Sequence, residues 1–269
     1  MARSHTTYRT VAALILLGIM AIAFTSLGNW QLNRAAQRLA IKDAIQAGRN
    51  TSALALSPGT PAQDLVPWRP ATAHGIWLHQ LTVLLENRNY QGRPGYWVAT
   101  PLLIDAAANT AVLVLRGWLP RPMQPGAAMP DIPTPPDEQT VNGELLERVP
   151  RLFELWSWSD NNATQLPGKL PDPARPVPQL QNLDLAAYSK ASGLTLLPTV
   201  LAQDATSPNA QADKAAGTPL LQEWPVPSLD ADKNRGYALQ WFGFAAIAAG
   251  AWLVIAWRAL RRKITPSTL

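Results

Sequence analysis

Two long uncharged segments bracket the chain. No charged residue lies between Thr10 and Asn33, and none lies between Gly236 and Trp257. As a helix, the second segment would span about 33 Å, enough to cross a hydrocarbon core of about 30 Å. The pattern therefore predicts a membrane-spanning helix at residues 11–30 and another at 237–257. Short tails at 1–10 and 258–269 and a central domain at 31–236 complete the expected organisation.

The spacing of apolar residues changes along the central region. Residues 31–48 repeat apolar positions at helical spacing, whereas later segments alternate with a period of two, which is typical of half-buried strands. The strands predicted in this way are Ala71–Leu78, Leu81–Arg88, Tyr96–Ile104, Ala111–Trp118, Thr140–Leu146 and Leu196–Gln203, with a weaker candidate at Leu220–Trp224. A short helix is expected at Asp184–Ser192, ended by Gly193.

Loops are predicted where proline or small polar residues gather. The Pro-rich stretches cover residues 120–136 and 167–178, and residues 204–218 are small and polar. With short strands at hairpin spacing, the fold class is an α+β membrane protein. Its two transmembrane helices flank an extracytoplasmic antiparallel β domain, a partial barrel or a sandwich with short helices.

The distribution of charge predicts an orientation. The chain carries 23 basic and 18 acidic residues, and six of the basic ones lie in the two tails, which contain no acid. The positive-inside rule then places both termini in the cytoplasm and the central domain on the opposite side of the membrane. The first span is not preceded by a segment of transit-peptide character, which favours a bacterial cell inner membrane and a periplasmic central domain. The central region is close to neutral, so nucleic acid is not an expected partner. A cleaved signal peptide is the alternative for the first segment, although no clean A-x-A site follows it.

Composition excludes several kinds of site. The absence of Cys excludes disulfides, thiolate metal sites and thiol nucleophiles. His74 and His79 lie five apart on a predicted strand, so they should point to opposite faces and not share a metal. No catalytic motif is present, and we expect neither catalytic residues nor a metal site.

Aromatic and polar residues gather where the two predicted spans end. Trp30 and Arg34 follow the first span, and Tyr237, Gln240 and Trp241 open the second. If the spans pair, these five side chains would lie at one level of the bilayer, which we expect to be an interaction site. An aromatic belt at the membrane surface is the simpler alternative. Gln240 suggests a polar face directed towards the other span or a ligand.

A basic stripe extends the first span. Arg34, Arg38 and Lys42 are spaced four apart, and they would either extend to lipid headgroups or dock a partner.

The candidates in the central domain are mainly structural. The run before Arg116 is continuously apolar, which predicts a strand buried on both faces and a partner for the Arg116 charge. Trp118 would pack under the sheet or lie on its membrane-facing rim. Gly95 and Gly117 are expected to allow turns or close backbone approach.

Four ordered motifs resemble the Surfeit locus protein 1 family. They are LGNWQLNR at 27–34, GRPGY at 92–96 followed by Thr100-Pro101-Leu102, LVLRGWLP at 113–120, and YALQWF at 237–242. The resemblance implies a membrane-anchored, non-enzymatic assembly factor for cytochrome c oxidase that helps to insert heme a into the catalytic subunit. Heme a would then be a transferred ligand, and the implied partners are the catalytic subunit, other assembly factors and membrane lipid. Tyr96 and Pro101 belong to the second motif, where we expect them to have a structural role.

One position departs from the family pattern. Where family members commonly carry the proposed heme-ligating His, this chain has Asn234, which is a poor axial ligand. No cofactor-binding residue is therefore assigned. Two other classes remain as alternatives: an anchored extracytoplasmic enzyme, and a two-span protein that binds a ligand or partner without a heme role.

Overall fold

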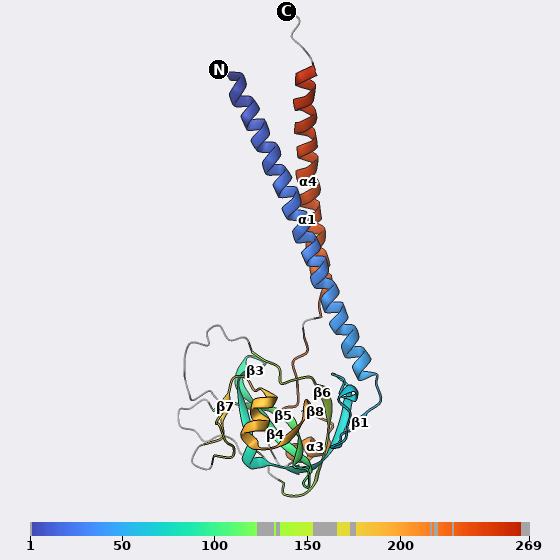
Figure 1. The fold of residues 1–269 in the computed structure, drawn as a ribbon, viewed down its shortest axis with the longest axis vertical. Helices are drawn as coiled ribbons and strands as arrows, with labels where there is room; N and C mark the ends of the chain where they lie inside the picture. Colours follow the sequence, from blue (N-terminus) through green and yellow to red (C-terminus); the bar gives the residue numbers. More distant parts are fainter. Residues whose placement is uncertain are drawn as a thin grey trace, which may run out of the picture. The chain divides into compact units, whose positions relative to one another are not determined.

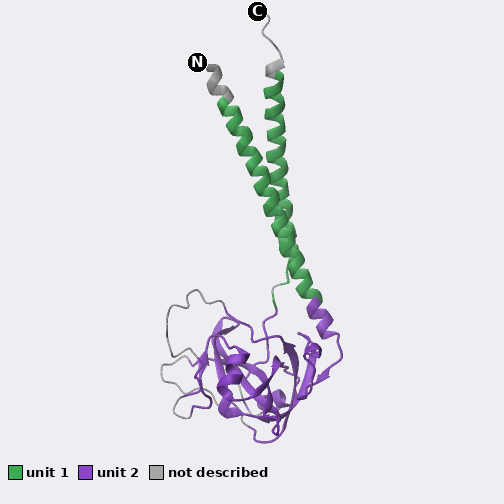
Figure 2. Ribbon diagram, in the orientation of Figure 1, with its two compact units in different colours: residues 1–43, 227–269 green, residues 44–226 purple. Residues whose placement is uncertain are grey.

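The chain divides into two compact units, a pair of long helices and a β-rich domain (Figure 2). The computed structural model describes residues 2–122, 132, 135–152, 166–172, 176–215, 217, 220–227 and 229–264. Much of the predicted Pro-rich loop at 120–136 and part of that at 167–178 lie outside these residues. The helical unit contains residues 1–43 and 227–269, and the β unit contains residues 44–226.

The helical unit consists of α1 (Ala2–Arg49) and α4 (Ala231–Ile264), which Figure 1 shows as two long helices. Both are long and apolar enough to cross a membrane. Most of their apolar side chains are exposed, as a lipid environment requires. This confirms the two predicted apolar helices. The helix expected at 31–48 is the unbroken continuation of α1, whose last turn belongs to the β unit.

The core of the β unit is a closed five-stranded barrel. Its strands are β2 (Pro70–Trp77), β6 (Gln139–Leu146), β8 (Thr195–Gln203), β5 (Thr110–Pro120) and β4 (Arg93–Asp105), and pairing of β4 with β2 closes the ring. Outside the ring, β3 (Val83–Tyr90) pairs with β4, β7 (Gln179–Leu180) with β3, and β1 (Leu54–Ala55) with β2. The predicted partial barrel is confirmed, and six predicted strands match observed ones within a few residues.

The sheet is mixed, which differs from the antiparallel expectation. Pairs β5–β8, β3–β7 and β1–β2 are parallel, and the others are antiparallel. Hairpin spacing predicts only the pairing of neighbours in sequence, whereas β8 reaches β5 after a long connection. The weak strand candidate at Leu220–Trp224 forms a single bridge, between Leu221 and Trp118.

Two apolar clusters lie on opposite faces of the barrel wall. The interior cluster takes side chains from all five barrel strands, including Trp77, Leu102 and Val114. The outer cluster lies between β3, β4 and β5 and the helix α2 (Leu185–Ser192). Asp184 caps α2 by accepting a hydrogen bond from the Ala187 backbone N–H at 2.9 Å, and Gly193 ends it with φ of 72°. The predicted α2 is thereby confirmed.

One end of the barrel interior holds a buried ion pair. A β-bulge between β4 and β5 leaves Arg116 without a ladder partner. Its side chain is fully buried, lies 4.6 Å from the centre of the Trp77 ring and pairs with Asp213 at 3.0 Å. Desolvation by burial lowers the pKa of Arg116 and raises that of Asp213. The partner expected for Arg116 is therefore Asp213.

Asp213 lies on a helix that the sequence did not suggest. The helix α3 (Pro208–Ala215) occupies most of the stretch 204–218, so the prediction of a loop there was wrong. Its buried face carries Asn209, Ala210 and Asp213, and Asn209 accepts a hydrogen bond from Gln203 and donates one to Gln139. Because this face is mainly polar, α3 shows no apolar stripe in its sequence.

We expect the Arg116→Ala variant to lose roughly 3–5 kcal/mol of unfolding free energy, because Asp213 would remain buried without its cation. The matched control is Arg49→Ala. Arg49 pairs with Glu144 through two contacts of 2.8 and 3.1 Å, but both side chains are about a third or more exposed. That variant should lose about 1 kcal/mol or less. Denaturant unfolding of the full chain in detergent, followed by tryptophan fluorescence, measures both. Equal losses would contradict this assignment.

Candidate functional site on the helix pair

The two long helices pack closely beside Gly28. A Cβ atom added at Gly28 would lie 2.7 Å from the Phe242 ring, so this position has no room for a side chain. Small residues allow helices in a membrane to approach in this way, where van der Waals contact drives association. Gly28 belongs to the first motif and Phe242 to the last, so the motifs meet across the helix pair.

A hydrogen bond between side chains joins the same two motifs. The Asn234 Nδ2 atom donates to Gln31 Oε1 at 2.6 Å, and Asn234 is 9% exposed. Asn234 Oδ1 is buried and accepts no hydrogen bond from the described residues. The polar contact across the helices is therefore made by Asn234, not by Gln240, which is exposed.

Arg38 adds a second polar contact one turn further along the pair. Its Nη1 atom donates to the Asp230 carbonyl oxygen at 2.6 Å. The Asp230 carboxylate in turn accepts a hydrogen bond from the Lys233 backbone N–H at 3.2 Å, in the first turn of α4. The basic stripe thus contributes one residue to the start of α4, while Arg34 and Lys42 are exposed.

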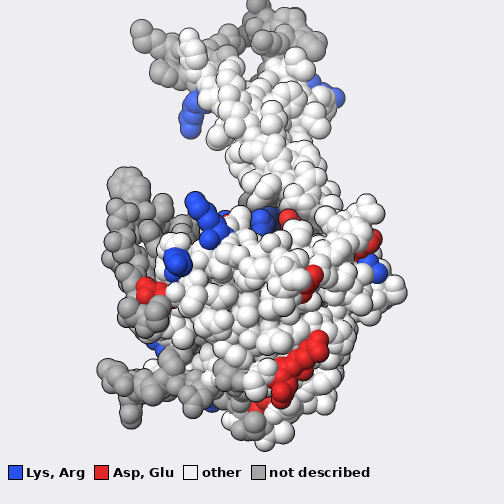
Figure 3. Space-filling view, turned by 60° about the horizontal axis from the view of Figure 1, so that its bottom comes forward, with Lys and Arg blue, Asp and Glu red and all other residues white. Residues whose placement is uncertain are grey.

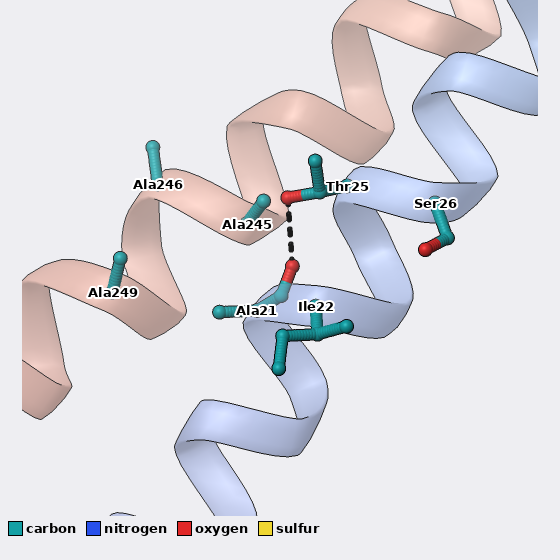
Figure 4. Close-up of a pocket in the computed structure, with 7 residues that line it drawn as sticks. All are labelled: Ala21, Ile22, Thr25, Ser26, Ala245, Ala246 and Ala249. Carbon is teal, nitrogen blue, oxygen red and sulfur yellow. Dashed lines mark hydrogen bonds between the residues drawn. The ribbon is translucent and has the colours of Figure 1, made fainter.

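The two sides of the helix pair differ in the size of their side chains. On one side the Phe24, Trp241 and Phe244 rings lie 5.7 to 6.0 Å apart, beside a cavity of about 350 Å³. The other side has a shallow cavity of about 460 Å³ with small side chains (Figure 4). There the Thr25 hydroxyl donates to the Ala21 carbonyl oxygen at 2.8 Å, so it is satisfied within α1.

The five side chains expected at one membrane level do not form a single contact cluster. Trp30 is 58% exposed and Tyr237 is 44% exposed, and Arg34 and Gln240 are exposed as well. Trp241 alone of the five makes a ring contact among the described residues. The other four point outwards from the pair, where they would meet lipid or a partner.

The remaining candidates lie in the β unit and hold its strands together. Gly95 faces the Leu119 carbonyl oxygen and the Trp118 ring, which leave no room for a Cβ atom. Gly117 adopts φ of 155° in the bulge, with Leu221 backbone atoms 3.2 Å from its Cβ position.

Trp118 is 4% exposed and packs under the sheet. Tyr96 and Pro101 are buried on β4, and the Pro101 carbonyl oxygen accepts from the Leu78 N–H at 3.0 Å.

Most of this chain is similar to known proteins. A profile of the SURF1 family matches residues 18–246, which includes all four motifs. The chain belongs to the SURF1 family. It is 27% identical over 259 residues to an uncharacterised SURF1-like protein of Mycobacterium bovis and to another of Mycobacterium tuberculosis. Those alignments cover 93% of this chain and 85% of each relative. A SURF1-like protein of Rickettsia felis is 30% identical over 105 residues, which cover 37% of this chain and 44% of that protein.

SURF1 proteins are generally assembly factors for cytochrome c oxidase. Because the resemblance also implies a heme ligand, we compared the residues at that position with the requirements of heme iron. At the position where the resemblance implies a His ligand, the Asn234 side chain is buried and bonded to Gln31. His74 and His79, the histidines whose side chains the structure describes, both lie in the β unit. His74 bonds to Thr140, and His79 lies on a 3₁₀ turn instead of the predicted strand. Among the side chains that the structure describes, the helical unit therefore has no histidine for axial ligation of heme iron.

Sequence reasoning missed the two partners that matter most here. From sequence, Gln31 is only one position of the first motif, and Asp213 lies in a predicted loop. A usable signal for Gln31 and Asn234 was present, because buried amides at the ends of apolar helices require polar partners. No group of three potential metal ligands occurs among the described residues.

We expect Gln31→Leu and Asn234→Leu each to weaken the helix pair, and the double variant to lose less than the sum of the two. The coupling free energy should be roughly 0.6–2 kcal/mol, as for hydrogen bonds between membrane helices. Far-UV circular dichroism during denaturant titration in mixed micelles measures it. Gln240→Leu, at an exposed amide on the same helix, should show no coupling to Gln31→Leu. Additive losses from Gln31→Leu and Asn234→Leu would show that the bond is not formed.

Proposed function

We propose that this SURF1 protein is an inner-membrane assembly factor for bacterial cytochrome c oxidase. The observation that carries the proposal is the contact between the first and last motifs, at Gln31–Asn234 and Gly28–Phe242. Both motifs lie within the residues that the family profile matches, and their contact supports the helix pair as the part of the protein that acts in assembly. The exposed side chains around that interface are the candidates for partner contact.

The proposed orientation rests on charge. The tails carry only basic residues, which favours both termini in the cytoplasm and the β unit in the periplasm. On the face drawn in Figure 3, charged side chains are almost absent from the described middle of the helical unit. An uncharged belt between charged ends is what a pair of spanning helices requires.

The proposed role in heme a insertion is indirect. Because Asn234 is engaged with Gln31, the iron would be ligated by another protein of the assembly complex. The helix pair would then act by holding the catalytic subunit and other assembly factors in position. Trp30, Arg34, Tyr237 and Gln240 are suited to this, since tryptophan, tyrosine and arginine dominate the energetics of many interfaces. Catalytic chemistry is not part of the proposal.

Deletion of the gene should selectively reduce the heme a signal in reduced-minus-oxidised spectra of membranes, leaving b-type and c-type hemes unchanged. Complementation with the wild-type chain should restore it. Arg34→Ala removes an exposed side chain of the proposed contact surface, and Trp241→Ala removes the ring that packs against Phe24 and Phe244. Each variant should restore roughly two- to tenfold less, although both keep the two spanning helices. Arg49→Ala, which changes an exposed arginine of the β unit, is the control.

Immunoblots of washed membranes must show equal amounts of each variant. Wild-type levels of heme a and of oxidase activity in both the Arg34 and Trp241 variants would overturn the assignment of the interaction site. An unchanged heme a signal in the deletion strain would overturn the assembly role itself.

A further inference from the structure

The β unit contains a small cavity surrounded by aromatic rings, separate from the helix pair. It has a volume of about 200 Å³ and lies at the ends of β3, β4 and β5, beside the segment 223–225. Its lining consists of Asn89, Tyr90, Gln91, Trp97, Trp118, Glu223, Trp224 and Pro225. All of these residues belong to the β unit.

The strands hold the rings of this cavity in place. Trp97 and Trp118 face each other across the β4–β5 ladder. Trp118 also exchanges two backbone hydrogen bonds with Leu221, at 2.8 and 3.0 Å, which brings Trp224 to the cavity. The indole N–H of Trp118 donates to the Arg88 carbonyl oxygen, and that of Trp224 to the Gln203 carbonyl oxygen. Two of the three indole N–H groups in the lining are thus bonded to backbone, and the rings offer a ligand mainly their π systems.

The rings form two contacting pairs. Tyr90 and Trp118 lie 5.3 Å apart at a tilt of 41°, and Trp97 and Trp224 lie 5.3 Å apart edge to face. Aromatic rings that line a small cavity attract a cation, because each ring has negative potential over its face. Arg88 already illustrates this property, since its guanidinium lies 4.3 Å from the centre of the Trp97 ring. Arg88 is 4% exposed and is not part of the cavity lining.

A carboxylate stands at the rim of the cavity. Glu223 Oε2 accepts a hydrogen bond from the Tyr90 hydroxyl at 2.6 Å, and this bond raises the pKa of Tyr90. Gln91 donates to the same hydroxyl at 3.1 Å. Glu223 is exposed, and within the described ranges no Lys or Arg forms an ion pair with it. The carboxylate is therefore positioned beside the rings while its charge has no cationic partner there.

We propose that this cavity receives the basic side chain of a partner protein, with arginine fitting best. A guanidinium group would stack on the rings and donate hydrogen bonds to the Glu223 carboxylate and to the amide oxygens of Asn89 and Gln91. A trimethylammonium group has no N–H and would leave these acceptors without a donor. An anion would face the Glu223 charge, and the cavity is far too small for a porphyrin. This inference does not depend on the role in oxidase assembly.

The test uses the full chain in detergent micelles with 5-fluorotryptophan in place of tryptophan. Trp224→Phe identifies the fluorine resonance of Trp224, and N-acetyl-arginine methylamide is then titrated. The Trp224 resonance should shift in a saturable manner, with a smaller shift for the lysine analogue. The neutral citrulline analogue and choline should bind at least roughly tenfold more weakly, because each lacks either the charge or the N–H donors.

Two variants assign the binding to this cavity. Glu223→Gln keeps an acceptor for the Tyr90 hydroxyl but removes the charge, and it should weaken arginine binding roughly tenfold. Glu138→Gln, at an exposed acid elsewhere in the β unit, should leave binding unchanged. If Glu223→Gln alters the spectrum of the free protein, Tyr90→Phe replaces it. Tyr90→Phe keeps the carboxylate but removes the hydrogen bond that holds it beside the rings. This variant should therefore also weaken arginine binding.

Each alternative outcome overturns the proposal. Equal binding of the citrulline analogue would show stacking without recognition of charge. Tighter binding of choline would identify a quaternary ammonium ligand instead. Binding that is unaffected by Glu223→Gln, or no shift of the Trp224 resonance at any concentration, would show that the cavity does not take a basic side chain.

Discussion

The hydrogen bond between Gln31 and Asn234 is the constraint on which the helical unit depends. Lipid tails are as apolar as the helix surfaces, so the hydrophobic effect does not drive α1 against α4 within a bilayer. Close packing and polar contacts must do so instead. Gly28 permits the close approach, and the Gln31–Asn234 bond, 2.6 Å long, fixes which faces meet. The first and last SURF1 motifs are therefore parts of one structure, although some 200 residues separate them.

The β unit is organised by a different polar contact. Buried polar side chains gather at the end of the barrel where Arg116, Gln203 and α3 meet. The bulge in β5 places Arg116 there, and Asp213 on α3 supplies the opposite charge. On the neighbouring stretch of β5, Gly117 and Trp118 bring in the segment that carries Trp224. The motif at residues 113–120 thus contributes Arg116 to the barrel interior and Trp118 to the aromatic cavity.

The sequence predicts those parts of the fold that depend on local pattern. The spanning helices follow from uncharged runs, the strands from period-two alternation, and α2 from its Asp184 cap and Gly193 stop. Pairing between distant segments leaves no such pattern, so the parallel β5–β8 pair differs from expectation. The helix α3 was missed because its buried side chains, Asn209 and Asp213, are polar.

The candidate site was predicted only in part. The motifs point to one level of the helix pair, but they do not show which of their side chains face inwards. Trp30 and Arg34 point outwards, whereas Gln31, which follows Trp30 directly, contacts α4. A single helix sequence with apolar residues on all sides gives little indication of its packing face.

Chemical cross-linking tests the central contact most directly, because the native chain contains no cysteine. Gln31→Cys and Asn234→Cys would be combined, treated with a short bismaleimide in native membranes, and cleaved at a protease site inserted within residues 120–136. The two halves of the cleaved chain should remain joined through the cross-link. The pair Gln31→Cys and Gln240→Cys, whose second position faces outwards, should separate. Halves that separate in the first pair, or that remain joined equally in both, would contradict the proposed meeting of the two motifs.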